Sequence, residues 1–396
     1  MRAFVFTDKA LAGQAGRFVW LEIDTEKKEN AELRTKFPMP ALPTYFVLDP
    51  VTEKVVLRWV GGATVAQLDG ILEDGSRAVS GAKPAASAKS TGGEAARGGA
   101  AVADAALARA DALYGEGKDA DAATAYQEAL AAAPAGWPRY GRAVESLLFA
   151  LQQSEQYEAA AVLARDAFAR LARTTSAANV AATGLDSALE LPAENPQRAG
   201  LVVALEADAR AVAEDATLAV AADDRSGVFI ALLDARKAAT DSAGARAVAG
   251  RWAKFLDGEA ARAPNPEARA VFDSHRLSAY LELGEPERAI PMLAASERDL
   301  PGDYNPAARL ATAYKAMQHW DDALAASDRA LARAYGPRRL GILQTRSDIY
   351  KGRGDLEMAR STLEDALREA EALPAGQRSD RTIAAIRKKL DALPKS

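Results

Sequence analysis

The sequence predicts a mainly helical chain with a small mixed α/β module at its N-terminal end. Three observations lead to this prediction. Residues 1–76 contain short apolar runs of strand character separated by helical patterns. Residues 77–102 are rich in Gly, Ala, Ser and Lys and have no apolar periodicity, which is typical of a flexible linker. Residues 103–396 keep a helical spacing of Ala and Leu almost throughout.

The N-terminal module is expected to contain three strands, at residues 17–24 (RFVWLEID), 44–49 (TYFVLD) and 55–60 (VVLRWV). A polar helix over residues 26–37 would connect the first two strands and make them parallel. The short turn after Asp49 would make the second and third strands an antiparallel hairpin.

Helices are expected at both ends of this module. A short helix precedes Gly16. A closing helix begins at Thr64, because Thr64 and Gln67 have the spacing of a capping box, and it continues through Ile71 and Leu72.

This order of elements resembles the C-terminal two-thirds of a thioredoxin domain. The residues that carry the resemblance are Val19 to Asp24 as an apolar strand with an acidic end, Leu42-Pro43-Thr44 at the start of the next strand, and Trp59-Val60-Gly61-Gly62 after the hairpin. The resemblance implies a cis peptide bond before Pro43. It also implies that Leu42, Pro43 and Thr44 form a loop that binds substrate beside the redox cysteines.

The sequence departs from the thioredoxin pattern because its 396 residues contain no cysteine. Residues 1–8 resemble the part of the helix just downstream of the Cys-x-x-Cys in that family, so the central strand and both cysteines would precede Met1. One hypothesis is that the natural protein has an upstream segment carrying this strand and a Cys-x-x-Cys. The alternative is a degenerate, redox-inactive remnant that serves as a spacer or docking surface.

Small residues recur in the helical part at a nearly constant interval. Ala289, Ala323 and Ala359 are 34 and 36 residues apart, and Ala122 and Ala160 are 38 apart. The first unit has a pattern of small, large, turn, small, aromatic, small and proline positions, at Ala110, Leu113, Gly117, Ala122, Tyr126, Ala129 and Pro134. Both the period and the pattern resemble tetratricopeptide repeats, which are stacked pairs of helices.

The resemblance implies an α-solenoid of helix pairs over residues 103–396. The clear repeats are 103–136, 141–174, 270–303, 304–337 and 340–373. Residues 175–269 are less regular and are expected to form degenerate repeats. An amphipathic helix over residues 379–393 would cap the last apolar face.

Composition excludes several classes of function. The net charge is −5, with both signs spread along the chain, so nucleic acid is not an expected partner. The only histidines, His275 and His319, are not spaced as a ligand pair, and no metal site or cofactor is expected. No common catalytic motif is present, and no apolar run reaches the roughly 18 residues of a membrane span. The sequence as given therefore indicates no catalytic activity.

Repeat solenoids of this kind bind peptides on the concave face made by the first helix of each pair. Here that face would present Asn305, Thr312, Lys315, Gln344 and Lys351. Three of these, the asparagine and the two lysines, suit a clamp for a peptide's terminal carboxylate, whereas the nearby Asp348 opposes it. The alternative is that all five are ordinary solvated residues of a helix face.

The favoured functional hypothesis is a protein-interaction scaffold that recruits a protein or peptide partner. In its full-length form the thioredoxin-like module would act on that partner by thiol–disulfide exchange. The alternative is a redox-inactive adaptor or assembly factor that uses this module only for docking. The sequence leaves the compartment open between the cytoplasm and the periplasm.

Overall fold

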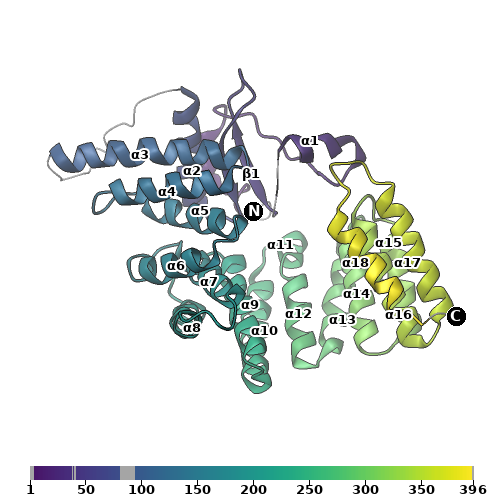
Figure 1. The fold of residues 1–396 in the computed structure, drawn as a ribbon. Helices are drawn as coiled ribbons and strands as arrows, with labels where there is room; N and C mark the ends of the chain where they lie inside the picture. The colour runs from purple at the N-terminus through teal and green to yellow at the C-terminus, as the bar shows by residue number, and fades with distance from the viewer. Residues whose placement is uncertain (1–3, 38, 40–41, 81–93, 395–396) are drawn as a thin grey trace. The chain divides into compact units, whose positions relative to one another are not determined.

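The computed structural model describes residues 4–37, 39, 42–80 and 94–394 (Figure 1). It is mainly helical, which confirms the expected class. Its elements, in order along the chain, are η1 (Lys9–Gln14), η2 (Lys28–Asn30), α1 (Ala31–Lys36), β1 (Thr44–Leu48), β2 (Val55–Val60), α2 (Val65–Ser80), α3 (Glu94–Gly115), α4 (Asp119–Ala132), α5 (Tyr140–Gln153), α6 (Tyr157–Leu171), α7 (Ala177–Glu190), α8 (Arg198–Glu214), α9 (Ala222–Ala238), α10 (Ser242–Arg262), α11 (Pro266–Ala270), α12 (Asp273–Leu283), η3 (Pro286–Arg288), α13 (Ala289–Asp299), α14 (Asn305–Ala316), α15 (Trp320–Leu331), α16 (Arg338–Arg353), α17 (Leu356–Glu371) and α18 (Asp380–Asp391).

The chain forms two compact units. Unit 1 contains Met1–Phe18 and Pro38–Val248, and unit 2 contains Val19–Phe37 and Ala249–Ser396. The segment Val19–Phe37 thus belongs to unit 2, although the residues on both sides of it belong to unit 1. This division differs from the predicted modules, because the β1–β2 hairpin and α2 fall in one unit with α3 to α9.

The β1–β2 hairpin forms as the sequence predicts, with Tyr45 opposite Trp59 and an irregularity between Val47 and Leu48. One face of β2 contributes Leu57 and Trp59 to a core shared with α2. Because side chains alternate along a strand, Arg58 points to the other face.

Arg58 fixes the hairpin to α3 and α4. Its side chain is buried, its guanidinium carbon lies 3.5 Å from the centre of the Tyr114 ring, and its Nη2 is 2.7 Å from the Asp119 carboxylate. The sheet therefore has a helix on each face, α2 on one and α3 on the other.

The predicted capping box opens α2. The backbone N–H of Gln67 donates to Thr64 Oγ1 at 3.2 Å, and the backbone N–H of Thr64 donates to Gln67 Oε1 at 2.9 Å. These two bonds satisfy donors that the first helical turn would otherwise leave without partners.

The strand predicted at residues 17–24 is wrong. These residues form no strand, and the side chains of Val19 and Leu21 are 89% and 75% exposed. An apolar run becomes a strand only where a sheet edge receives it, and β1 and β2 pair with each other in the sheet that the structure describes. The parallel pairing expected through residues 26–37 is therefore also absent there, and the thioredoxin-like fold is not supported.

Both ends of the segment predicted as a linker are helical. Residues 77–80 continue α2, and residues 94–102 already belong to α3. The middle of the predicted linker, residues 81–93, lies outside the described residues. Small-residue composition misled here because Ala-rich ends of a linker are also good helix formers.

Within each unit, helices that follow one another along the chain pack together in pairs. Contacts join α3 to α4, α5 to α6, α7 to α8, α12 to α13, α14 to α15, and α16 to α17. Helices of the same kind also touch across neighbouring pairs, as α5 touches α7 and α14 touches α16. This double pattern of contacts is that of stacked helical repeats.

The irregular stretch at residues 175–269 also forms long helices, α7 to α10. The C-terminal helix α18 packs on α17 and buries Ile383 and Ile386. Ser379 caps it by accepting the backbone N–H of Thr382 at 3.2 Å. Within the described part of the chain, no helix combines the length and apolarity needed to cross a bilayer.

Candidate protein-interaction site

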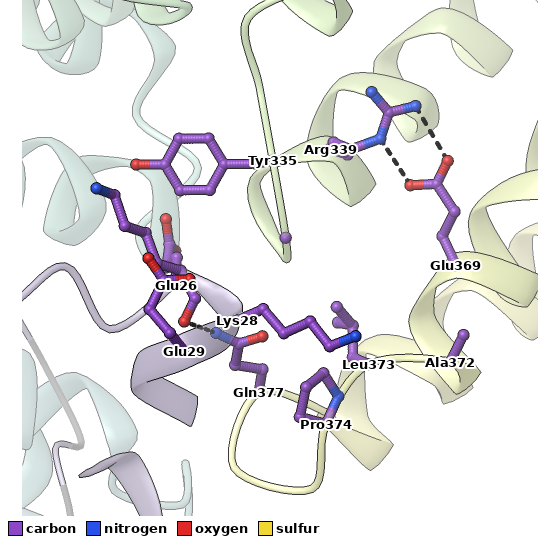
Figure 2. A pocket seen from close by; sticks show the side chains of 12 residues that line it. Glu26, Lys28, Glu29, Tyr335, Arg339, Glu369, Ala372, Leu373, Pro374 and Gln377 are labelled. Carbon is purple, nitrogen blue, oxygen red and sulfur yellow. Dashed lines mark hydrogen bonds and ion pairs between the residues drawn. The ribbon is translucent and has the colours of Figure 1, made fainter. Parts of the chain in front are cut away.

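Unit 2 holds a segment of its own chain that is remote in sequence. Residues 24–31 lie against the corner between α15 and α16 and against the loop between α17 and α18 (Figure 2). Tyr335 and Arg338 come from the first of these places, and Gln377 comes from the second. Asp24 and Tyr335 are 311 residues apart in the sequence.

Asp24 opens a tight turn, which we call the acidic turn (residues 24–27). Its carboxylate accepts the backbone N–H of Glu26 at 3.0 Å, and its carbonyl accepts that of Lys27 at 3.3 Å. The side-chain amide of Asn30 donates to the same carbonyl at 2.8 Å. An aspartate that bonds the backbone two residues ahead preorganises such a turn.

Two side chains of unit 2 bind the acidic groups of this turn. The Tyr335 hydroxyl donates to Asp24 Oδ2, and Arg338 Nη2 donates to the same oxygen at 3.0 Å. Arg338 Nε donates to Glu26 Oε2, so one guanidinium serves both carboxylates. The centres of the Tyr335 and Tyr304 rings lie 4.7 and 5.5 Å from the Arg338 guanidinium carbon, within the range of a cation–π contact.

These contacts shift the pKa values of Asp24 and Arg338. Burial alone raises the pKa of Asp24, but the hydrogen bonds from Tyr335 and the Glu26 backbone and the charge of Arg338 lower it below its usual value. Burial alone lowers the pKa of Arg338, but Glu26 and Asp24 raise it overall. Both groups therefore carry their charge in the docked state.

Gln377 binds the backbone of the same turn. Its side-chain Nε2 donates to the carbonyl of Thr25 at 3.0 Å and to that of Lys27 at 2.8 Å. The residue is 5% exposed, and Thr25 is buried beside it. A side-chain amide that reads two carbonyls recognises the shape of a turn whatever side chains it carries.

Two glycines permit this close approach. A Cβ added at Gly336 would overlap the carbonyl oxygen of Glu26, and one added at Gly376 would overlap that of Ala31. Gly336 also has a positive φ of 53°, which disfavours other residues. The loops before α16 and before α18 are thus shaped to receive the segment.

A pocket of about 480 Å³ lies beside the docked segment. Arg339 and Glu369 form a two-point ion pair on one side of it, at 2.9 and 3.1 Å, and the amide of Gln377 reaches toward the turn on the other (Figure 2). The residues that line it are Glu26, Lys27, Lys28, Glu29, Tyr335, Gly336, Arg339, Glu369, Ala372, Leu373, Pro374 and Gln377.

The residues predicted on the concave face lie on two helices that touch each other. Asn305, Thr312 and Lys315 are on α14, and Gln344 and Lys351 are on α16. We call these five residues the α14–α16 face. Gln344 is half-buried and Lys351 is exposed.

Some groups of this face already have partners within unit 2. The Asn305 side chain donates to Asp303 at 2.8 Å, and Thr312 donates to the Ala308 carbonyl at 3.3 Å. Asp348 lies 3.8 Å from the Lys315 ammonium and 3.1 Å from that of Lys389. The negative charge of Asp348, which opposes a carboxylate clamp, is therefore balanced by two lysines, Lys315 of α14 and Lys389 of α18.

The predicted loop Leu42-Pro43-Thr44 lies in unit 1. The Leu42–Pro43 peptide bond is cis, the Pro43 carbonyl accepts the backbone N–H of Gly61 at 2.9 Å, and Thr44 pairs with Val60. Leu42 is 68% exposed. A substrate-binding role for this loop stays a prediction from the resemblance.

Sequence reasoning missed Tyr335, Arg338, Gln377 and the acidic turn. One signal was present, because the spacing of 36 rather than 34 residues placed an insertion around Tyr335-Gly336-Pro337. That insertion forms the corner that receives the acidic turn. Nothing in the spacing indicated a partner more than 300 residues away.

Comparisons with known proteins found similarity among solved structures. The chain matches no protein-family model and no curated protein. A tetratricopeptide repeat protein from Parabacteroides merdae ATCC 43184 has 12% identity and a TM-score of 0.45, with 73% of this chain and 98% of that chain covered. The TPR2AB domain of yeast Sti1, solved with pHSP90, has 16% identity and a TM-score of 0.27, with coverage of 73% and 98%.

A third structure, the Cut9–Hcn1 hetero-tetramer of the APC/C, has 14% identity and a TM-score of 0.32. The comparison covers 73% of this chain and 50% of that one. The description of this chain as helical repeats follows from its own contacts between helices.

Proposed function

We propose that this chain is a protein-interaction scaffold whose helical repeats bind polypeptide segments of a partner. The observation that carries the proposal is that unit 2 holds a remote segment of its own chain by side-chain contacts to both carboxylates and backbone carbonyls. This is the way in which a protein binds a peptide, here seen within one chain.

The α14–α16 face is the proposed surface for the partner. Exposed or half-buried polar side chains of two neighbouring helices lie together there, and Lys351 is exposed. Helices stacked in this way present a continuous surface that can follow an extended peptide. The carboxylate clamp remains one form that such binding can take.

Thiol–disulfide exchange is not part of this proposal. The 396 residues contain no cysteine, so the exchange of a recruited partner's disulfides remains a prediction from the resemblance. The adaptor function needs only the surfaces described above.

Selection from a library of displayed peptides tests the scaffold function, with the full chain as bait. We expect enriched peptides whose binding weakens at least tenfold in Lys351→Glu. The matched control is Lys254→Glu, which makes the same charge change at an exposed position of α10 and should leave binding unchanged. A library without any enriched peptide contradicts the scaffold function, whereas enriched peptides that ignore Lys351→Glu contradict only its assignment to the α14–α16 face.

A further inference from the structure

The acidic turn occupies a site that is built for its chemistry. We propose that Tyr335, Arg338 and Gln377 form a recognition site for an Asp-x-Glu turn presented by a partner protein. In this chain residues 24–27 fill the site in cis, and the partner's turn displaces them. The proposal rests on the scaffold function and names the chemistry of one partner.

The charges of the site select two carboxylates. Arg338 bonds Asp24 and Glu26 at once, and the Tyr335 hydroxyl adds a second donor to Asp24. Bonds between a charged donor and a charged acceptor are the strongest of the ordinary hydrogen bonds. A turn with Asn and Gln in place of these acids could keep its shape but would lose this attraction.

The shape of the site selects a turn. Gln377 reads the carbonyls of Thr25 and Lys27, and Gly336 and Gly376 leave room for the backbone at Glu26 and Ala31. These contacts use only main-chain atoms of the segment. Any chain with the same backbone course therefore satisfies them as well as residues 24–31 do.

The cis contact is of a kind that a partner can displace. The side chains of Asp24, Glu26 and Arg338 are 27%, 25% and 25% exposed, so each remains in part accessible to a competing carboxylate. The adjacent pocket has Ala372, Leu373 and Pro374 in its wall, and an apolar side chain of a partner gains burial there.

Binding of a labelled peptide in trans tests this inference. The probe is a fluorescent peptide of residues 19–37, and the protein is the full chain. The double variant Asp24→Asn, Glu26→Gln keeps a side-chain oxygen at position 24 that can accept the backbone N–H of residue 26. It removes both carboxylates from the chain's own turn, which therefore competes less well with the probe. We expect this double variant to bind the probe at least tenfold more tightly than the unaltered chain does.

Adding Arg338→Ala to the double variant should abolish the gain. The matched control adds Arg353→Ala instead, which removes another arginine of α16 that pairs with Asp321 and should leave the gain intact. The same probe with Asn and Gln at the two acidic positions should bind at least tenfold more weakly. Thermal unfolding of each variant checks that its fold is retained.

Three results would overturn the inference. They are equal binding of the probe by the unaltered chain and the double variant, binding that Arg338→Ala does not change, and a dimer of the chain that the double variant dissociates. The last would show that a second copy is the occupant. If displayed peptides are enriched on the full chain while the acidic probe fails, the scaffold function stands and only this inference falls.

Discussion

Two carboxyl groups of unit 1 are removed from solvent: Glu145 on α5 is buried, and Asp224 on α9 is half-buried. Burial raises the pKa of each to about 7. Hydrogen bonds from Ser176 and Asn179 partly offset this for Glu145, whereas the charge of Asp223 adds repulsion at Asp224. Between their usual values and pH 7 the folded state binds more protons than the unfolded state, so stability falls as pH rises.

We expect Asp224→Asn to stabilise the chain by about 1 to 3 kcal/mol at pH 8, because the variant no longer has a charge to bury there. At pH 5 the folded carboxyl is already protonated and only the unfolded one is ionised, so the stabilisation should be clearly smaller than at pH 8. Urea unfolding followed by circular dichroism at the two pH values measures both effects. Asp121→Asn, at an exposed position of α4, is the control and should change stability by less than about 0.5 kcal/mol at either pH. Equal effects of Asp224→Asn at pH 5 and pH 8 would contradict the assignment.

Single residues were the least predictable part of the site. The α14–α16 face could be named from sequence because repeats fix which helix positions share a face. Arg338 and Gln377 could not, because each acts on a segment more than 300 residues away. Their own neighbours in sequence give no indication of that segment.

At the scale of elements, small residues set how closely the helices approach. Gly184 on α7 lies where α6 and α8 converge, and a Cβ there would overlap Ala164 and come within 3.0 Å of Leu205. Gly200, on α8, has open space around it. A Gly→Ala substitution can therefore be compared at a tightly packed position, Gly184, and at an open one, Gly200.

Gly184→Ala should destabilise the chain by about 1 to 3 kcal/mol, because the packed helices must move apart. Gly200→Ala should instead stabilise it by about 0.5 to 1 kcal/mol, since alanine favours a helix where nothing is in contact. Thermal or urea unfolding of the two variants measures the difference. A neutral or stabilising effect of Gly184→Ala would show that α7 is not tightly packed at this position.

Local patterns predicted the elements that depend on local contacts. The β1–β2 hairpin, the capping box of α2 and the helix pairs all involve residues close in sequence. The strand at residues 17–24 was wrong because strand formation needs a distant edge to pair with. An apolar run by itself does not reveal whether such an edge exists.

At the scale of the whole molecule, the segment Val19–Phe37 decides how the chain is divided. It leaves unit 1, packs within unit 2, and is followed by residues that again belong to unit 1. Composition suggested a single boundary in residues 77–102, because a Gly- and Ser-rich stretch is the usual sign of a junction. Amino-acid composition does not reveal a division that arises because one segment docks on a remote part of the chain.

The central claim is that unit 2 binds the acidic turn as it would a peptide, and hydrogen exchange of the full chain tests it most directly. Gly376→Ala should displace the segment through overlap with the Ala31 carbonyl, whereas Gly302→Ala meets open space and serves as the control. Mass spectrometry of peptides covering residues 24–31 measures exchange of their backbone amides. The account predicts exchange at least tenfold faster in Gly376→Ala and unchanged in Gly302→Ala; equal exchange in both variants would contradict it.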